Sequence, residues 1–445
     1  MKRKLNILSL FLLLSLLLSA CAPAGGEAGK LDPPITAEAK DYVSLLTLRM
    51  DSETVKAEAT VKTFVDGDTT HFYVDDPSIE GGVLKARYLA VNTPESTGKI
   101  EEYGKKASNF TKEKLSSATS IIVESDNETW NKDSTGSRTL AWVWYKTDDM
   151  TEYRNLNLEI LQNGLAQASN TGGNRYGDTC LAALNQAKQQ KLNLYSGEKD
   201  PDFYYGSAVE LTLKELRANT SAYEGMKVAF KGIIATNSGT QGVYVEDFDA
   251  ETGLNYGIYI YYGHSLSGMG LDVLSVGNEA RIVGTVQYYE GGGTWQVSDL
   301  NYQMMRPKDP DNIQKLSTGH SAAYTPLSLE DFLNGTVSLQ GEEETITVPY
   351  AQAILNTSVS LDGLKVTSAY TTDDEDSSSK GAMTLTCEKD GKTVTIRTAV
   401  LTDESGNLIT QDAYLDKTIS VKGIVDYFDG NYQIKVFSAK NITIN

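Results

Sequence analysis

The alternation of apolar and polar residues predicts mainly β-strands in this 445-residue chain. Thr60–Val65 and Thr69–Val74 alternate with the period of two that half-buried strands show, and Asp66-Gly67 between them is a strong hairpin signal. Three more strands are expected at Val83–Val91, Ile121–Glu124 and Leu140–Tyr145, and helices at Glu101–Ser117, Asn157–Asn163 and Cys180–Asn193. We therefore expect residues 56–200 to form a small α+β domain on a β-barrel.

The C-terminal half contains an internal repeat. Residues 281–289 are followed by a glycine-rich turn and Trp295-Gln296-Val297, and residues 420–428 by Asp429-Gly430 and Tyr432-Gln433-Ile434. A matching strand precedes each copy, at 224–228 and 362–366. Short strands, one glycine within each (Gly284 and Gly423) and a late hairpin are typical of a small closed barrel. The repeat predicts two domains at 205–310 and 325–445, which resemble OB-type barrels, so the chain as a whole is expected to be mainly β.

The N-terminus has the pattern of an export signal. Lys2, Arg3 and Lys4 precede an apolar run, Leu5–Leu18, that is too short to span a membrane comfortably. The run ends in Leu18-Ser19-Ala20-Cys21, which resembles the processing site of bacterial lipoproteins. The resemblance implies a signal peptide at 1–20, lipidation of Cys21 and a membrane-anchored protein at the bacterial cell surface.

The segment after Cys21 is rich in small, flexible residues, so residues 21–55 are expected to form a tether. Within it, residues 38–50 are expected to form a short amphipathic helix. An ordinary signal peptide that happens to contain a cysteine is the alternative interpretation.

Negative charge is concentrated in the C-terminal half. The chain has a net charge of −19, and residues 201–445, with 17 basic and 32 acidic residues, account for −15 of it. This half repels a polyanion on average, which disfavours tight nonspecific binding of nucleic acid. Chemistry on phosphates is therefore expected in the first half, with the help of a local cation.

The few cysteine and histidine residues do not suggest a metal site or a catalytic triad. Cys180 and Cys387 have no neighbouring metal ligand, and either a single disulfide or two buried thiols would account for them. His71, His264 and His320 are scattered, which disfavours a histidine zinc site or a Ser-His-Asp hydrolase.

Two segments carry the residues that phosphoryl chemistry needs. Asp68 follows the first hairpin turn, and Asn92, Thr93 and Glu95 lie in a turn that Pro94 enforces. Their oxygen atoms suit a hard cation such as Ca²⁺, and Glu95 could orient or deprotonate a water. The guanidinium groups of Arg87 and Arg138 suit a phosphate. Taken singly, each segment is equally typical of an ordinary turn.

The same residues belong to a set of collinear motifs that resembles the thermonuclease family of calcium-dependent, staphylococcal-type nucleases. The resemblance covers about residues 57–197. It rests on Val65-Asp66-Gly67-Asp68-Thr69, Arg87-(x)4-Asn92-Thr93-Pro94-Glu95, residues 102–108, 138–144, 157–166 and 187–196.

The resemblance implies an OB-type β-barrel that cleaves phosphodiesters of DNA, RNA or both. It implies that Asp68 and the Thr93 carbonyl ligate calcium, and that Asp66 lies in the outer shell of the metal. It further implies that Glu95 activates water, and that Arg87 and Arg138 bind phosphate and stabilise the transition state.

Three positions depart from the family pattern. Asn92 stands where the family has a second calcium aspartate, so weaker calcium binding is expected. The loop before Arg138 is one residue longer than usual. The family's nucleotide-stacking tyrosines are replaced by Ser169 and Asn170, with Tyr176 the nearest aromatic residue, so no base preference is implied.

Two function hypotheses follow. The first is an exported, lipid-anchored nuclease, which the joint presence of Asp68, Arg87, Glu95 and Arg138 favours. The alternative is a catalytically degenerate surface module that binds nucleic acid or protein.

For the C-terminal barrels, capture of single strands, binding of a protein, and simple packing of the aromatic residues stay open. The aromatic residues in question are Tyr244, Tyr288, Tyr289, Trp295, Tyr427 and Tyr432.

Overall fold

The computed structural model describes residues 39–239, 241–340, 345–374, 377, 379–428 and 430–445. The expected signal peptide at 1–20, Cys21 and the first part of the expected tether lie outside these residues. From Asp41 onward the chain belongs to one compact unit. Among the described residues, no helix is long and apolar enough to cross a membrane.

The first barrel has five strands, as the alternation predicts. They follow the order β1, β2, β3, β7, β5 around the barrel, with β5 returning to β1. The bounds are β1 (Lys56–Asp66), β2 (Thr69–Val74), β3 (Val83–Tyr88), β5 (Ser120–Glu124) and β7 (Thr139–Lys146). The β3–β7 pair is parallel and the others are antiparallel, which is how five strands in this connection order close.

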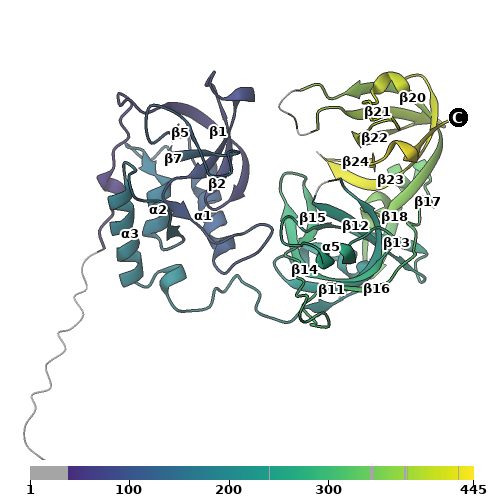
Figure 1. Cartoon of the computed structure of the whole chain (residues 1–445), viewed down its shortest axis with the longest axis horizontal. Coiled ribbons are helices and arrows are strands. Elements are labelled where there is room, and N and C mark those ends of the chain that lie inside the picture. Colours follow the sequence, from purple (N-terminus) through teal and green to yellow (C-terminus); the bar gives the residue numbers. More distant parts are fainter. Residues whose placement is uncertain (1–38, 240, 341–344, 375–376, 378, 429) are drawn as a thin grey trace, which may run out of the picture. The chain divides into compact units, whose positions relative to one another are not determined.

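Three helices accompany this barrel, again where helical spacing predicts them (Figure 1). They are α1 (Gly104–Ser116), α2 (Leu156–Gln162) and α3 (Gly177–Gln189). The short strands are β4 (Val91–Asn92), β6 (Asn131–Lys132), β8 (Arg154–Asn155) and β9 (Gln167–Ala168). Trp142 and Trp144 of β7 are fully buried in the core of this domain.

The second and third barrels repeat the same connection order, which confirms the predicted internal repeat. The second consists of β11 (Lys227–Asn237), β12 (Gly242–Asp249), β13 (Leu254–Tyr261), β14 (Glu279–Tyr289) and β15 (Thr294–Ser298). The third consists of β20 (Ser358–Thr371), β21 (Ala382–Lys389), β22 (Lys392–Val400), β23 (Thr418–Phe428) and β24 (Asn431–Val436). The chain is therefore mainly β, with three closed barrels of the OB type.

Smaller elements complete these two barrels. The helices are α4 (Leu213–Ala218), α5 (Met269–Val273), α6 (Leu329–Asn334) and α7 (Tyr350–Ala353). The strands are β10 (Val209–Glu210), β16 (Gln314–Ser317), β17 (Thr325–Pro326), β18 (Thr336–Gln340), β19 (Thr345–Pro349) and β25 (Ile442–Ile444).

The repeat's glycines sit where two strands approach closely. A Cβ atom on Gly284 would lie 2.6 Å from the carbonyl oxygen of Ser298, and one on Gly423 would lie 2.7 Å from that of Lys435. Any side chain here would push the late hairpin out of the barrel. Cys180 and Cys387 are both buried and free, so the thiols are not joined in a disulfide.

Residues 41–55 differ from the expected tether and helix. Only Val43–Leu45 form a single 3₁₀ turn. Val43 is buried in the core of the first barrel, the N–H of Tyr42 donates to Gln162 Oε1 at 2.6 Å, and Asp41 pairs with Arg154 at 3.0 Å. These tertiary contacts outweigh the weak helical pattern, so the ordered first domain begins at Asp41 rather than at residue 56.

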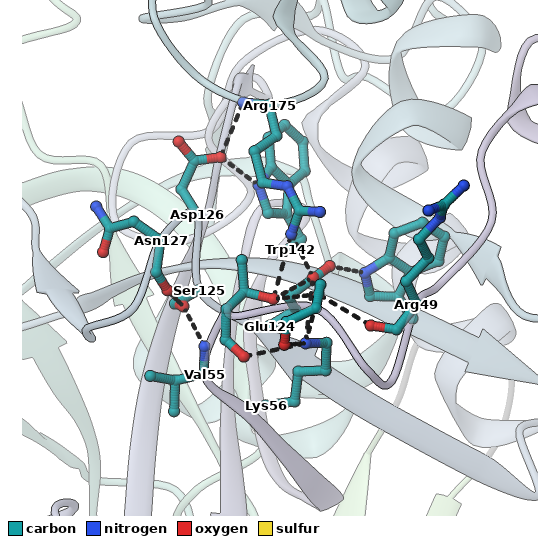
Figure 2. Close-up of polar contacts among 12 residues, drawn as sticks. Arg49, Val55, Lys56, Glu124, Ser125, Asp126, Asn127, Trp142 and Arg175 are labelled. Carbon is teal, nitrogen blue, oxygen red and sulfur yellow. Dashed lines mark hydrogen bonds and ion pairs between the residues drawn. The ribbon is translucent and has the colours of Figure 1, made fainter.

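A buried carboxylate ties this segment to the barrel. Glu124, at the end of β5, is fully buried and accepts hydrogen bonds from Thr54 Oγ1 at 2.6 Å and Trp144 Nε1 at 2.8 Å. Figure 2 shows Lys56 and Arg175 on either side of it, and Arg175 donates at 2.7 Å. Two cations and two neutral donors offset the cost of burying this charge.

The Glu124→Gln variant should destabilise the first barrel by about 3 kcal/mol, because Arg175 and Lys56 would then lack a buried counter-charge. Three of the four tryptophans lie in this domain, so urea unfolding followed by tryptophan fluorescence reports on it. Glu128→Gln, at an exposed position nearby, is the matched control. Equal stability of the two variants would contradict a stabilising role for Glu124.

Candidate active site

Two turns of the first barrel meet at the predicted residues. The turn between β1 and β2 carries Asp66 and Asp68, and the turn after β4 carries Thr93 and Glu95. Asp68 is buried, and its Oδ2 accepts a hydrogen bond from the N–H of Thr93 at 2.9 Å. This hydrogen bond connects the two turns, although Asp68 and Thr93 lie 25 positions apart in the chain.

Arg87 bridges two of the predicted metal ligands. It lies on β3 opposite Thr69, and its guanidinium donates to Asp68 Oδ1 and, at 2.6 Å, to Asn92 Oδ1. Burial raises the pKa of Asp68, while the charge of Arg87 acts in the opposite direction. Asp68 and Asn92 therefore already point their oxygens at one cation, which here is Arg87.

Asp66 and Glu95 form a second carboxyl pair beside the first. Burial raises the pKa of Asp66 to about 8, and a side-chain hydrogen bond to Glu95 acts in the same direction. Ser96 Oγ and the N–H of Gly67 each donate to Asp66 Oδ1 at 2.7 Å. Asp66 is thus a buried neighbour of Glu95, whose own side chain is exposed.

Helix α1 holds both turns in place. Thr111 Oγ1 donates to the carbonyl of Gly67 at 2.6 Å, which fixes the first turn. Gly104, the first residue of the helix, lies so close to the second turn that a Cβ would come within 2.2 Å of the Glu95 carbonyl oxygen. The helix therefore packs directly on the backbone that carries Glu95.

Arg138 stands apart from this group. Its Nε donates to Asp133 Oδ2 at 2.7 Å, and among the described residues it forms no hydrogen bond or ion pair with the other predicted site residues. Partial burial raises the pKa of Asp133, but hydrogen bonds from Thr135 and Arg138 lower it to about 2. Arg138 still directly precedes β7, which runs parallel to the strand of Arg87 with Leu140 opposite that residue.

The donor atoms at the two turns suit a hard cation. Asp68 supplies a carboxylate, Asn92 an amide oxygen and Thr93 a buried Oγ1 that makes no hydrogen bond with any described residue. Oxygen-only ligands of this kind are those that Ca²⁺ prefers. In the described ranges no group of three or more His, Cys, Asp or Glu residues is placed to hold a metal ion, at these turns or elsewhere. The chemistry of these oxygen donors is therefore compatible with calcium, although Arg87 occupies the Asp68 and Asn92 oxygens in this structure.

The structure also assigns roles that the sequence did not signal. Ser96, Thr111 and Asp133 are ordinary polar residues in sequence, and only the fold shows that they position Asp66, the first turn and Arg138. Tyr176, the aromatic residue nearest to the missing stacking positions, packs edge-on against Trp142 at 5.0 Å and Trp144 at 5.8 Å. It belongs to a packed aromatic cluster rather than to an open stacking surface.

Comparisons with known proteins match the same barrel. The family model "Staphylococcal nuclease homologue" matches residues 85–197. A thermonuclease of Staphylococcus intermedius is 34% identical over 139 residues, which cover 30% of this chain and 74% of that protein. A thermonuclease of Staphylococcus hyicus is 33% identical over 136 residues, which cover 30% of this chain and 72% of that protein.

Proposed function

Because the chain belongs to the thermonuclease family, we propose that its first barrel hydrolyses phosphodiester bonds of DNA, RNA or both. The observation that carries the proposal is the meeting of Asp68, Arg87 and Glu95 at two adjoining turns. A carboxylate for a cation, a guanidinium for a phosphate and a second carboxylate for water are the parts that this reaction requires.

Each residue has a distinct task in this scheme. Arg87 binds a non-bridging phosphate oxygen and stabilises the charge that grows there in the transition state. Glu95 accepts the proton of the attacking water, while Asp66 beside it fixes the carboxylate by a shared hydrogen bond. Arg138 reaches the same phosphate once it leaves Asp133, from the start of the strand that neighbours β3. Asp68, Asn92 and Thr93 would hold a calcium ion, which would supply Lewis-acid polarisation of the phosphate.

A degenerate binding module is the competing function. Such a module would keep the barrel but lack a metal ligand, a phosphate-binding arginine or the carboxylate that activates water. All four candidate residues, Asp68, Arg87, Glu95 and Arg138, are present, and three of them are brought together. This favours the enzyme over the binding module. The cleavage rates of the parent and of one variant distinguish these two functions.

The Glu95→Gln variant should cleave a single-stranded DNA oligonucleotide at least about 100-fold more slowly in kcat, because the amide cannot take a proton from water. Glu113→Gln, an exposed position on α1, is the control and should keep the parental rate. An unchanged rate in Glu95→Gln would remove Glu95 from the reaction, and absence of cleavage by the parent would favour the binding module.

The Asn92→Asp variant should bind Ca²⁺ about tenfold more tightly, because it restores a negative ligand at a position that now contributes only an amide oxygen. Isothermal titration calorimetry measures this affinity without relying on activity. Asn109→Asp adds the same charge at an exposed position and controls for general electrostatics. Equal affinity of the parent and Asn92→Asp would exclude Asn92 as a calcium ligand.

We also propose that the protein is exported and anchored at the bacterial cell surface through a lipid on Cys21. Expressed in a bacterial host with its own N-terminus, the chain should partition with the membrane fraction. The Cys21→Ala variant should lose this association, because a lipid chain is what binds the membrane. The same distribution for both proteins would contradict anchoring at Cys21.

A further inference from the structure

The second and third barrels are joined by buried polar contacts. Glu246 of β12 is buried, and it accepts hydrogen bonds from the N–H and the Oγ of Ser358 at 2.7 Å each and from the N–H of Ala323 at 2.8 Å. Arg217 of α4 donates to the carbonyl of Gln352 at 2.7 Å. Leu339 of β18 is part of the hydrophobic core of the second barrel. These contacts fix one barrel against the other.

Equivalent faces of the two barrels line one cleft. In the late hairpin of the second barrel Gln287 lies opposite Gln296, and in that of the third barrel Asp426 lies opposite Gln433. Val286, Val297, Val425 and Ile434, each next to one of them, belong to the barrel cores, so these four side chains point outward. All four line the same cleft, which residues of the first barrel such as Gly98 and Lys112 also line, so each C-terminal barrel contributes one polar pair to it.

Aromatic rings from both barrels meet in this cleft. The ring of Tyr244 lies 4.9 Å from that of Tyr259 and 5.5 Å from that of Phe437, measured between centroids. Tyr244 comes from the second barrel and Phe437 follows β24 of the third. Burial raises the pKa of Tyr244 well above its usual value, so its hydroxyl remains a neutral hydrogen-bonding group.

The cleft also contains buried polar atoms that have no partner among the described residues. Asn356 is 3% exposed, and its Oδ1 makes no hydrogen bond there. Its backbone N–H donates to the carbonyl of Val425, which places it next to Asp426. Gln287 is 6% exposed; its Oε1 accepts a hydrogen bond from the N–H of Gly98 of the first barrel at 3.3 Å, and only its Nε2 lacks a partner among the described residues. Leaving an amide unsatisfied is costly, so a neutral ligand with hydroxyl groups would stabilise both.

We propose that this cleft binds an oligosaccharide. Sugar hydroxyls match the amides of Gln287, Asn356 and Gln433, which both donate and accept hydrogen bonds. The apolar face of a sugar ring matches the aromatic rings beside them. OB-type barrels bind oligosaccharides as well as oligonucleotides, so the fold permits either occupant.

Charge decides against a nucleic acid in this cleft. Asp426 is a half-buried acid on its wall, and Gln433 Nε2 donates to its Oδ2 at 2.8 Å. Two cations of the third barrel line the cleft near it: Arg397 donates to Thr384 Oγ1 at 2.9 Å, and Lys435 Nζ lies over the ring of Phe437. The surrounding half of the chain carries a net charge of −15. A phosphodiester backbone would meet this repulsion, whereas a neutral glycan would not. The sequence had left single strands and a protein as partners of these barrels, and a glycan is a different class of ligand.

The test uses the chain from residue 22 onward on an array of immobilised oligosaccharides of glucose, galactose, mannose and N-acetylglucosamine. The chain should bind at least one of these classes. Gln433→Ala should weaken that binding at least tenfold, because it removes a hydrogen-bonding amide from the cleft wall. Gln287→Ala provides an independent variant on the opposite wall, should Gln433→Ala not fold. Gln352→Ala removes an exposed amide outside the cleft and should bind like the parent.

A labelled twelve-residue oligo(dT) is titrated in parallel. No binding to any saccharide, or binding that folded Gln433→Ala and Gln287→Ala retain in full, would overturn the proposal. Oligo(dT) binding that these variants weaken would overturn it as well, in favour of single-strand capture. None of these outcomes depends on whether the first barrel is a nuclease.

Discussion

The hydrogen bond from the N–H of Thr93 to the buried carboxylate of Asp68 is the constraint on which the candidate site depends. It joins a hairpin turn to a second turn that follows β4, and both Asp68 and Thr93 are buried. A buried carboxylate is costly unless a cation compensates its charge. Arg87 does so in this structure, and the expected calcium ion would do the same. The same bond places Glu95, two residues after Thr93, beside Asp66.

Much of the first barrel could be predicted from the sequence. The period-two alternation located all five strands, and the helical spacing located α1, α2 and α3 to within a few residues. The Asp66-Gly67 signal placed the hairpin correctly because a two-residue turn leaves little freedom. Residues 41–55 were the exception, because Val43 and Asp41 take their structure from contacts made with residues more than 100 positions away.

The site could be predicted in part. Asp68, Arg87, Asn92, Thr93 and Glu95 do come together, since the motif spans two strands that the barrel makes neighbours. Arg138 could not be placed from sequence, because its direction depends on Asp133 and on the conformation of the loop between them. The cleft of the C-terminal barrels could not be predicted either. The repeat gave two barrels, but only their mutual contacts, such as Glu246 with Ser358, bring the equivalent faces together.

The central claim is that the first barrel is a calcium-dependent nuclease, and chelation tests it most directly. Purified chain is incubated with end-labelled single- and double-stranded DNA and RNA in Ca²⁺, after removal of the metal with EGTA, and after Ca²⁺ is restored. The account predicts cleavage of at least one of these substrates, its loss in EGTA and its full recovery on restoring Ca²⁺. Cleavage that persists in EGTA, or no cleavage of any substrate in Ca²⁺, would contradict it.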